Sequence, residues 1–193
     1  MTGELSVVSG GGGGGGGGVV WICGLSGVGK TTLALEVARL LAEVHANVVR
    51  IDGDDFRRTF MPGAGYEREE RIKVARAISQ HAWQFAQRGS LCVVATISLF
   101  DAIHDSNRVC ERAYQLPFIL SLLSAPVSLL NERRASLMHN ATNIVGTHIT
   151  AEFPSAPDHM FLNDGRIESL LAEAIVIRDI WLTRQQTTGH RTA

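Results

Sequence analysis

The sequence predicts an α/β fold, with a parallel sheet of about five strands and helices on both faces. Short apolar runs typical of buried strands alternate along the chain with longer segments whose apolar residues repeat at helical spacing. This alternation is typical of parallel sheets, because a helix returns the chain to the start of the next strand. Such sheets bind ligands at the carboxyl ends of their strands, so we expect functional residues in the loops that follow.

Five apolar runs are expected to form the strands. The first run, Val19 to Cys23, is apolar at every position and ends at a glycine, which fits a strand buried on both faces. The five predicted strands are residues 19–23, 48–51, 91–95, 118–123 and 159–162.

Helices are expected between the strands. After the first strand, helical spacing is kept by Leu33, Val37, Leu40, Leu41 and Val44. A long helix that ends near Gly89 has one face made of Ala75, Ile78, Ala82, Phe85 and Ala86. Pro126 favours the first turn of another helix. A turn at residues 163–165 leads into a last helix, whose inward face is expected to hold Ile167, Leu170, Leu171, Ala174 and Ile177.

A length of 193 residues is enough for one globular domain with a sizeable core. An unbroken glycine run from Gly10 to Gly18 precedes the first strand, and glycine loses the most backbone freedom on ordering. We therefore predict a disordered glycine-rich tail over residues 1–18, a single domain over 19–185 and a C-terminal tail over 186–193.

The composition argues against several classes of partner. The formal net charge is −1, which disfavours a broad nucleic-acid surface, and no apolar run reaches the roughly 20 residues of a membrane helix. Cys23, Cys92 and Cys110 have no disulfide-like or metal-like spacing, and the first two lie in strand-like runs where buried thiols are expected. These features predict a cytoplasmic protein without a nucleic-acid or membrane partner.

A phosphate-binding loop follows the first strand. Residues 24–31, GLSGVGKT, match GxxxxGK[ST] between a strand and a helix, which is the context this motif requires. Glycines let backbone N–H groups wrap phosphate, the lysine reaches the β- and γ-phosphates, and the threonine hydroxyl can bind Mg²⁺. The motif predicts a P-loop NTPase fold, with Mg²⁺ bound through Thr31. The predicted ATP-binding residues of this loop are Gly24, Leu25, Ser26, Gly27, Val28, Gly29, Lys30, Thr31 and Thr32.

An acidic and basic segment follows the second strand. Asp52 and Asp54 should lie beside the phosphate loop, where carboxylates can orient a magnesium-bound water or accept a hydroxyl proton. Arg57 and Arg58 come next and can form forked contacts with an anionic acceptor. The chain contains no NKxD guanine-reading pattern and no apolar run ending in Asp-Glu, so small-molecule kinases are the leading class.

Four motifs in this order, GLSGVGKTT, IDGDDFRR, GYEREER and ATISLF, resemble the adenylylsulfate kinase family over residues 19–108, and more loosely over 117–180. The resemblance implies transfer of the γ-phosphate of ATP to the 3′-hydroxyl of adenosine 5′-phosphosulfate. It implies a catalytic role for Lys30, and for Asp54 or Asp52 as the acceptor-side base. It further implies a lid over residues 132–150 with Arg133 near ATP, and an acceptor site formed by Asp54, Arg57, Tyr66, Arg71, Ile97 and Ser98.

The chain departs from the family pattern on the acceptor side and in the lid. Val74 replaces an asparagine, Leu99 a proline, Asp101 an arginine and Ile144 the stacking aromatic residue of the lid. Three alternatives therefore stay open: a kinase of a cytidine diphosphate derivative such as cytidine diphosphoramidate, a sugar or antibiotic kinase, and an ATP-binding module with little or no turnover. The sequence also leaves open whether the chain forms a homodimer.

Overall fold

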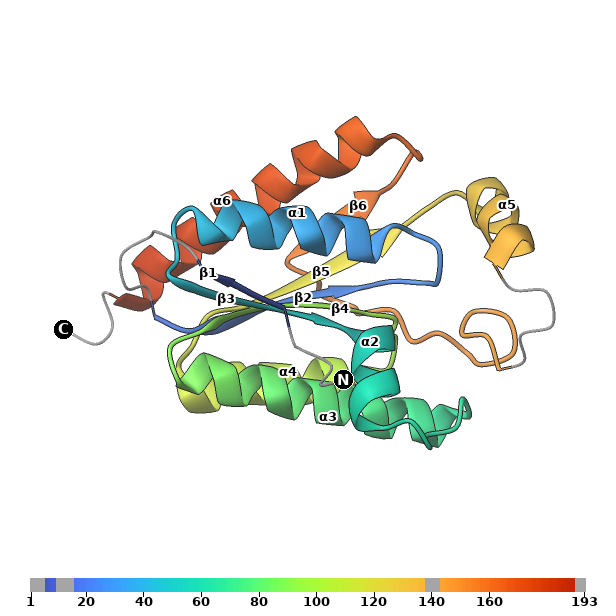
Figure 1. The fold of residues 1–193 in the computed structure, drawn as a ribbon, viewed down its shortest axis with the longest axis horizontal. Coiled ribbons are helices and arrows are strands. Elements are labelled where there is room, and N and C mark those ends of the chain that lie inside the picture. Colours follow the sequence, from blue (N-terminus) through green and yellow to red (C-terminus); the bar gives the residue numbers. More distant parts are fainter. Residues whose placement is uncertain (1–5, 10–15, 138–142, 190–193) are drawn as a thin grey trace.

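The computed structural model describes residues 6–9, 16–137 and 143–189 as a six-stranded sheet between two layers of helices (Figure 1). The strand order is β1-β3-β4-β2-β5-β6. Strands β2 to β6 are parallel and β1 pairs with β3 in the antiparallel sense. The bounds are β1 Ser6–Ser9, β2 Gly18–Cys23, β3 Asn47–Asp52, β4 Leu91–Thr96, β5 Phe118–Ser124 and β6 His159–Leu162. The predicted α/β fold with five parallel strands is confirmed.

The helices are divided between the two faces of the sheet and its carboxyl end. Helices α1 (Lys30–Ala42) and α6 (Ile167–Gly189) cover one face, and α3 (Arg68–Gln87) and α4 (Asp101–Tyr114) cover the other (Figure 1). Helices α2 (Gly53–Phe60) and α5 (Val127–Leu137) follow the ends of β3 and β5. The phosphate loop follows the central strand β2. It therefore lies at the carboxyl edge of the sheet, where the short helices α2 and α5 also begin.

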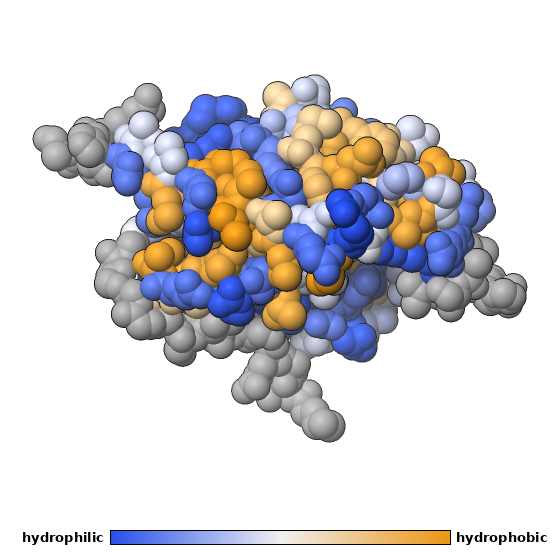
Figure 2. Space-filling view, turned by 90° about the horizontal axis from the view of Figure 1, so that it is seen from above, coloured by the Kyte–Doolittle hydropathy of each residue, from blue (hydrophilic) through white to orange (hydrophobic). Residues whose placement is uncertain are grey.

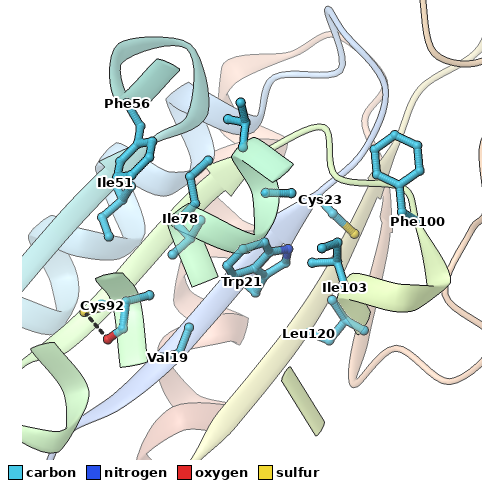
Figure 3. Close-up of a cluster of buried hydrophobic side chains, with 14 of the residues drawn as sticks. Val19, Trp21, Cys23, Ile51, Phe56, Ile78, Cys92, Phe100, Ile103 and Leu120 are labelled. Carbon is cyan, nitrogen blue, oxygen red and sulfur yellow. Dashed lines mark hydrogen bonds between the residues drawn. The ribbon is translucent and has the colours of Figure 1, made fainter. Parts of the chain in front are cut away.

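Two buried clusters of apolar side chains hold these layers together. The cluster under α3 and α4 is built around Trp21, which is fully buried, with Phe56, Ile78, Phe100 and Leu120 among its members (Figure 3). The cluster under α1 and α6 includes Trp181, which is also fully buried. Burying such side chains supplies most of the favourable free energy of folding, at roughly 25 cal/mol per Å² of apolar surface.

Helix α6 packs with a narrower apolar face than its sequence suggests. Leu170, Ala174 and Ile177 are buried as predicted, whereas Ile167 and Leu171 are 47% and 40% exposed. The buried face continues instead to Trp181, because positions 170, 174, 177 and 181 follow one side of the helix. Figure 2 shows the molecule from the side of α1 and α6, where apolar groups are interrupted by polar ones.

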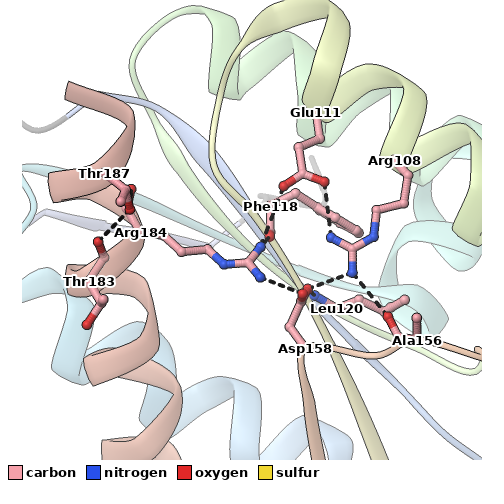
Figure 4. Close-up of polar contacts among 9 residues, drawn as sticks. All are labelled: Arg108, Glu111, Phe118, Leu120, Ala156, Asp158, Thr183, Arg184 and Thr187. Carbon is pink, nitrogen blue, oxygen red and sulfur yellow. Dashed lines mark hydrogen bonds and ion pairs between the residues drawn. The ribbon is translucent and has the colours of Figure 1, made fainter. Parts of the chain in front are cut away.

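An ion-pair network joins β5 to the helices on either side. Asp158 accepts hydrogen bonds from Arg108 of α4 at 2.8 Å and from the Leu120 amide at 2.7 Å, and it pairs with Arg184 of α6 (Figure 4). Arg184 also donates to the Phe118 carbonyl. The loop before β6 is thereby fixed to both helical layers.

Several boundaries differ from the sequence-based expectation. Residues 1–18 were expected to be a disordered tail, but Ser6–Ser9 form the edge strand β1, and Gly17 and Gly18 are buried under Ala86 and Trp181. Residues 1–5 and 10–15 lie outside the described residues. At the other end, α6 continues to Gly189, past residue 186 where the C-terminal tail is predicted to begin. On α1, Val44 is exposed because the helix has already ended at Ala42.

The described part of the chain has no helix long and apolar enough to cross a membrane. Cys23 and Cys92 are buried thiols, as expected, and burial raises the pKa of each to about 12. Cys92 donates a weak hydrogen bond to the Ala82 carbonyl (Figure 3).

Candidate active site

The phosphate loop joins β2 to α1 in a backbone conformation that favours glycine at two positions. Gly27 and Gly29 have φ angles of 84° and 101°, in the left-handed region that side chains with a Cβ avoid. Helix α1 begins at Lys30, directly after the loop, and its first N–H groups have no partner within the helix. The loop and the positive end of the helix dipole together form an anion-binding site.

Two cationic side chains reach this loop from different directions. Lys30 donates from Nζ to the Leu25 carbonyl at 2.8 Å. Arg133, on α5, donates from Nη1 to the Gly27 carbonyl at 2.7 Å. A nucleotide phosphate placed on the loop would therefore have positive charge on two sides.

Asp52 connects the phosphate loop to the segment after β3. Its Oδ2 accepts from the Thr31 hydroxyl at 2.8 Å, and its Oδ1 accepts from the Asp54 amide at 3.0 Å, which caps α2. Arg50 lies 3.9 Å from the same carboxylate. Carboxylate and hydroxyl oxygens are ligands that Mg²⁺ prefers, so Thr31 and Asp52 present a donor set that fits this ion. Among the described residues, no group of three or more His, Cys, Asp or Glu side chains could hold a metal by itself.

Arg57 and Arg71 flank the ring of Tyr66. Their guanidinium carbons lie 4.5 and 5.2 Å from the ring centroid. Both are oriented by backbone carbonyls, Arg57 by Ala64 at 3.1 Å and Arg71 by Tyr66 at 2.8 Å. Burial lowers the pKa of Arg71, and the nearby charge of Arg57 lowers it further. Two guanidinium groups that repel each other in a partly buried site favour the binding of an anion between them.

Ser98, one of the predicted acceptor-binding residues, has polar groups that form hydrogen bonds with the protein core. Its hydroxyl accepts from the Trp21 indole at 3.0 Å, and its carbonyl accepts from His104 Nε2 at 2.9 Å, so both groups have partners in the core. Ser98 has a φ angle of 22°, an uncommon value for a residue with a side chain. These contacts hold the turn between β4 and α4 in one conformation.

One pocket brings most of the predicted residues together. It has a volume of about 300 Å³. The predicted residues that line it are Ser26, Gly27, Gly29, Lys30, Thr31, Thr32, Asp52, Asp54, Arg57, Tyr66, Arg71, Ile97, Ser98 and Arg133. Three predicted residues of the phosphate loop do not line the pocket: Gly24, Leu25 and Val28. Gly24 and Val28 are buried.

Other lining residues were not predicted as site residues: Gly53, Val74, Ala75, Ala95, Thr96 and Phe100. Thr96 could have been found, because it ends the strand beside the phosphate-loop strand. Phe100 carries no comparable signal, because its place in the pocket depends on how α4 packs.

The predicted lid, residues 132–150, contacts the pocket residue Arg71 and also the phosphate loop. Arg71 Nη2 donates to the Asn143 carbonyl at 2.9 Å on one side. On the other side Gly146 lies against Leu25 of the phosphate loop. Residues 138–142 of this lid lie outside the described residues.

Comparisons with known proteins identify the family. The adenylylsulphate kinase family model matches residues 16–158. An adenylyl-sulfate kinase of Acaryochloris marina is 30% identical over 72% of this chain and 70% of its own length. A Sorangium cellulosum protein named "Probable bifunctional SAT/APS kinase 2" is 35% identical over 72% of this chain, which spans 24% of that protein.

Another curated protein and a solved structure also match the chain. A cytidine diphosphoramidate kinase of Campylobacter jejuni is 33% identical over 47% of this chain and 52% of its own length. The structure of the Mycobacterium tuberculosis APS kinase in complex with AMPPNP and APS superposes with a TM-score of 0.76, at 24% identity over 86% of this chain and 98% of that one. By its motifs, its fold and these matches, the chain belongs to the adenylylsulfate kinase family of phosphotransferases.

Proposed function

We propose that this chain transfers the γ-phosphoryl group of ATP to a hydroxyl of a small nucleotide-like acceptor, such as adenosine 5′-phosphosulfate. The observation that carries the proposal is the single pocket that joins the phosphate loop to Asp54, Arg57 and Arg71. Donor and acceptor sites must adjoin for direct transfer, because the attacking oxygen approaches the γ-phosphorus in line with the leaving oxygen.

Each group in the pocket has a separate task in this proposal. Lys30 and the loop amides stabilise the negative charge that develops on the transferred group. Asp54, or Asp52 as the close alternative, accepts the proton of the attacking hydroxyl. Arg57 and Arg71 bind the anionic part of the acceptor. Mg²⁺ neutralises phosphate charge when it is bound, and Thr31 with Asp52 would hold it.

A kinase of a cytidine diphosphate derivative is the second candidate. The Campylobacter jejuni relative carries that activity in its name, and Val74 lines the pocket where the family pattern has an asparagine. An apolar residue there removes one hydrogen-bonding group from the acceptor side. The two candidate functions use the same phosphate loop and the same arginines, and their acceptors differ in the base and in the terminal anionic group.

The test is ADP release with each acceptor in turn. Purified protein, ATP and Mg²⁺ are mixed with adenosine 5′-phosphosulfate, with a cytidine diphosphate derivative, or with no acceptor, and Lys30→Ala is the control. Acceptor-dependent ADP release that Lys30→Ala abolishes supports the proposal, and the acceptor with the larger kcat/KM identifies the base. ATP binding without release on any acceptor favours the ATP-binding module and contradicts the proposal.

A further inference from the structure

The turn between β4 and α4 follows the strand next to β2 and contributes to the lining of the pocket; residues 98–101 of this turn are called the acceptor wall. Ser98 and Phe100 both line the pocket. Helix α4 begins at Asp101 with Phe100 at its N-cap, so no side-chain oxygen at that position caps the helix. Helix starts leave backbone N–H groups without intrahelical partners, and a cap therefore has to come from elsewhere.

Glu152 supplies that cap from a distant part of the chain. Its Oε2 accepts from the Asp101 amide at 2.8 Å, and its own amide donates to the Leu99 carbonyl at 2.9 Å. One residue is thus bonded to the backbone on both sides of Phe100. A carboxylate at a helix N-terminus is also favoured by the helix dipole.

The second carboxylate oxygen of Glu152 joins a third element. Its Oε1 accepts from Arg68, the first residue of α3. The guanidinium of Arg68 in turn lies 5.5 Å from the centroid of the Phe100 ring. The hydrogen bond from Arg68 and the hydrogen bond from the Asp101 amide lower the pKa of Glu152. The start of α3, the start of α4 and the Phe100 ring therefore meet at one carboxylate.

Glu152 also follows the stretch of chain that contacts Arg71 and the phosphate loop. Asn143 binds Arg71 on the acceptor side, and Gly146 packs against Leu25 on the ATP side. We propose that Glu152 is a positioning residue: through Asp101 and Arg68 it fixes the acceptor wall, and with it the place of the acceptor. The inference rests on the proposed function and on the acceptor-binding role predicted for Ser98, which lines this side of the pocket.

The acceptor wall can be observed without any turnover. Trp21, a member of the buried cluster in Figure 3, donates a hydrogen bond from its indole to the Ser98 hydroxyl at 3.0 Å. The Trp21 indole N–H therefore reports, by a faster hydrogen-exchange rate, whether the wall loosens. The Asp101 amide, whose acceptor is Glu152 itself, is a second reporter that shows whether the cap is lost. Both can be followed by NMR in the full chain.

The experiment compares Glu152→Ala and Glu152→Gln with the matched control Glu36→Ala. Glu36 also accepts hydrogen bonds from an arginine, Arg39, and its side chain is 22% exposed against 25% for Glu152, but it lies on α1 outside the pocket. The two KM values, kcat and the two exchange rates are measured for each variant. Glu152→Gln keeps an oxygen that can accept from the Asp101 amide and loses the charge.

Loss of Glu152 should act on the acceptor only. Glu152→Ala is expected to speed exchange at both reporters and to raise the KM for the acceptor about tenfold, with the KM for ATP within about twofold of wild type. Glu152→Gln should fall between Glu152→Ala and wild type, and it carries the test if Glu152→Ala does not fold. Glu36→Ala should match wild type in every readout.

Two results would overturn the inference. One is an unchanged exchange rate of the Trp21 indole N–H in the Glu152 variants. The other is an equal rise in the KM for the acceptor and the KM for ATP, which a merely structural role would give. If wild-type protein turns over no acceptor, the proposed function fails, while the exchange rates still decide whether Glu152 holds the wall.

Discussion

Substitution of Gly146 by alanine tests whether the lid bears on the ATP site. Gly146 has a φ angle of 84°, and a Cβ built on it would lie 2.7 Å from Leu25 Cδ2 in the phosphate loop. Gly89 is a matched control, because it has a φ angle of 86° and an added Cβ would meet nothing within 4 Å. The two alanine variants share the backbone strain and differ only in the contact with Leu25.

Two free-energy costs set the expected effects of these variants: the backbone strain of alanine at a positive φ angle, and the displacement of the Leu25 side chain. An alanine in the left-handed region costs about 1–2 kcal/mol, and we expect Gly89→Ala to lower the free energy of unfolding by that amount without changing ATP affinity. In Gly146→Ala the Leu25 side chain must also leave its rotamer, at a cost of about 0.5–1.5 kcal/mol. If this rotamer cost is present only in the conformation that binds ATP, the affinity for ATP drops about two- to tenfold.

The assay is isothermal titration calorimetry with ATP and Mg²⁺, combined with urea unfolding of both variants. A double-mutant cycle with Leu25→Ala isolates the contact, since removing the Leu25 side chain should restore the affinity that Gly146→Ala loses. Equal ATP affinity in Gly146→Ala and Gly89→Ala would refute the reasoning. So would an affinity loss that persists unchanged in the Leu25→Ala background.

Three further predictions concern single side chains. Asp52→Asn keeps an oxygen that caps α2 but removes the charge beside Thr31, so kcat should fall about 100- to 1000-fold while the circular dichroism spectrum stays unchanged. Burial lowers the pKa of His104 below its ordinary value of about 6.5, so the unfolded chain takes up this proton first as the pH falls. The stability contributed by neutral His104 is therefore complete above about pH 6.5 and is lost below it; His104→Gln should flatten this part of a urea-unfolding pH profile. Arg57→Met should raise the KM for the acceptor about tenfold, whereas Arg58→Met, at an exposed residue paired with Asp55, should not; equal effects would contradict the assigned role.

The elements that the sequence predicts well are those encoded locally. The phosphate loop needs glycines at fixed positions between an apolar strand and a helix, and residues 24–31 carry all of that information. The inner strands β2, β4 and β5 are apolar at nearly every position because both faces are covered. The predicted limits of all five parallel strands differ from the observed ones by at most one residue at either end.

The elements that were missed depend on tertiary contacts. Helix α4 was not predicted because its buried face includes His104 and Asn107, which hide the apolar periodicity. Asn107 is accommodated in the core because it accepts from Ser79 and from the Trp83 indole. Strand β1 forms only by pairing with β3, and its own sequence next to a glycine run gave no strand signal.

The candidate site likewise has one part that is encoded locally and one part that depends on tertiary contacts. The proposed donor half follows from one contiguous motif, whereas the residues proposed for the acceptor half come from α2, the start of α3 and the turn between β4 and α4. Glu152 caps a helix 51 residues away in the sequence, a distance over which no local pattern could indicate the contact. The named roles of the pocket residues stay predictions until the variants are measured.

The most direct test of the central claim is to follow a labelled γ-phosphoryl group. The protein is incubated with Mg²⁺, γ-labelled ATP and adenosine 5′-phosphosulfate or a cytidine diphosphate derivative, and the products are separated and identified by mass spectrometry. We predict that the label appears on a ribose hydroxyl of one acceptor, in equal amount to the ADP formed, and that Lys30→Ala abolishes it. Label found only in inorganic phosphate, or retained in ATP with every acceptor, would contradict the claim that this pocket joins the two substrates for direct transfer.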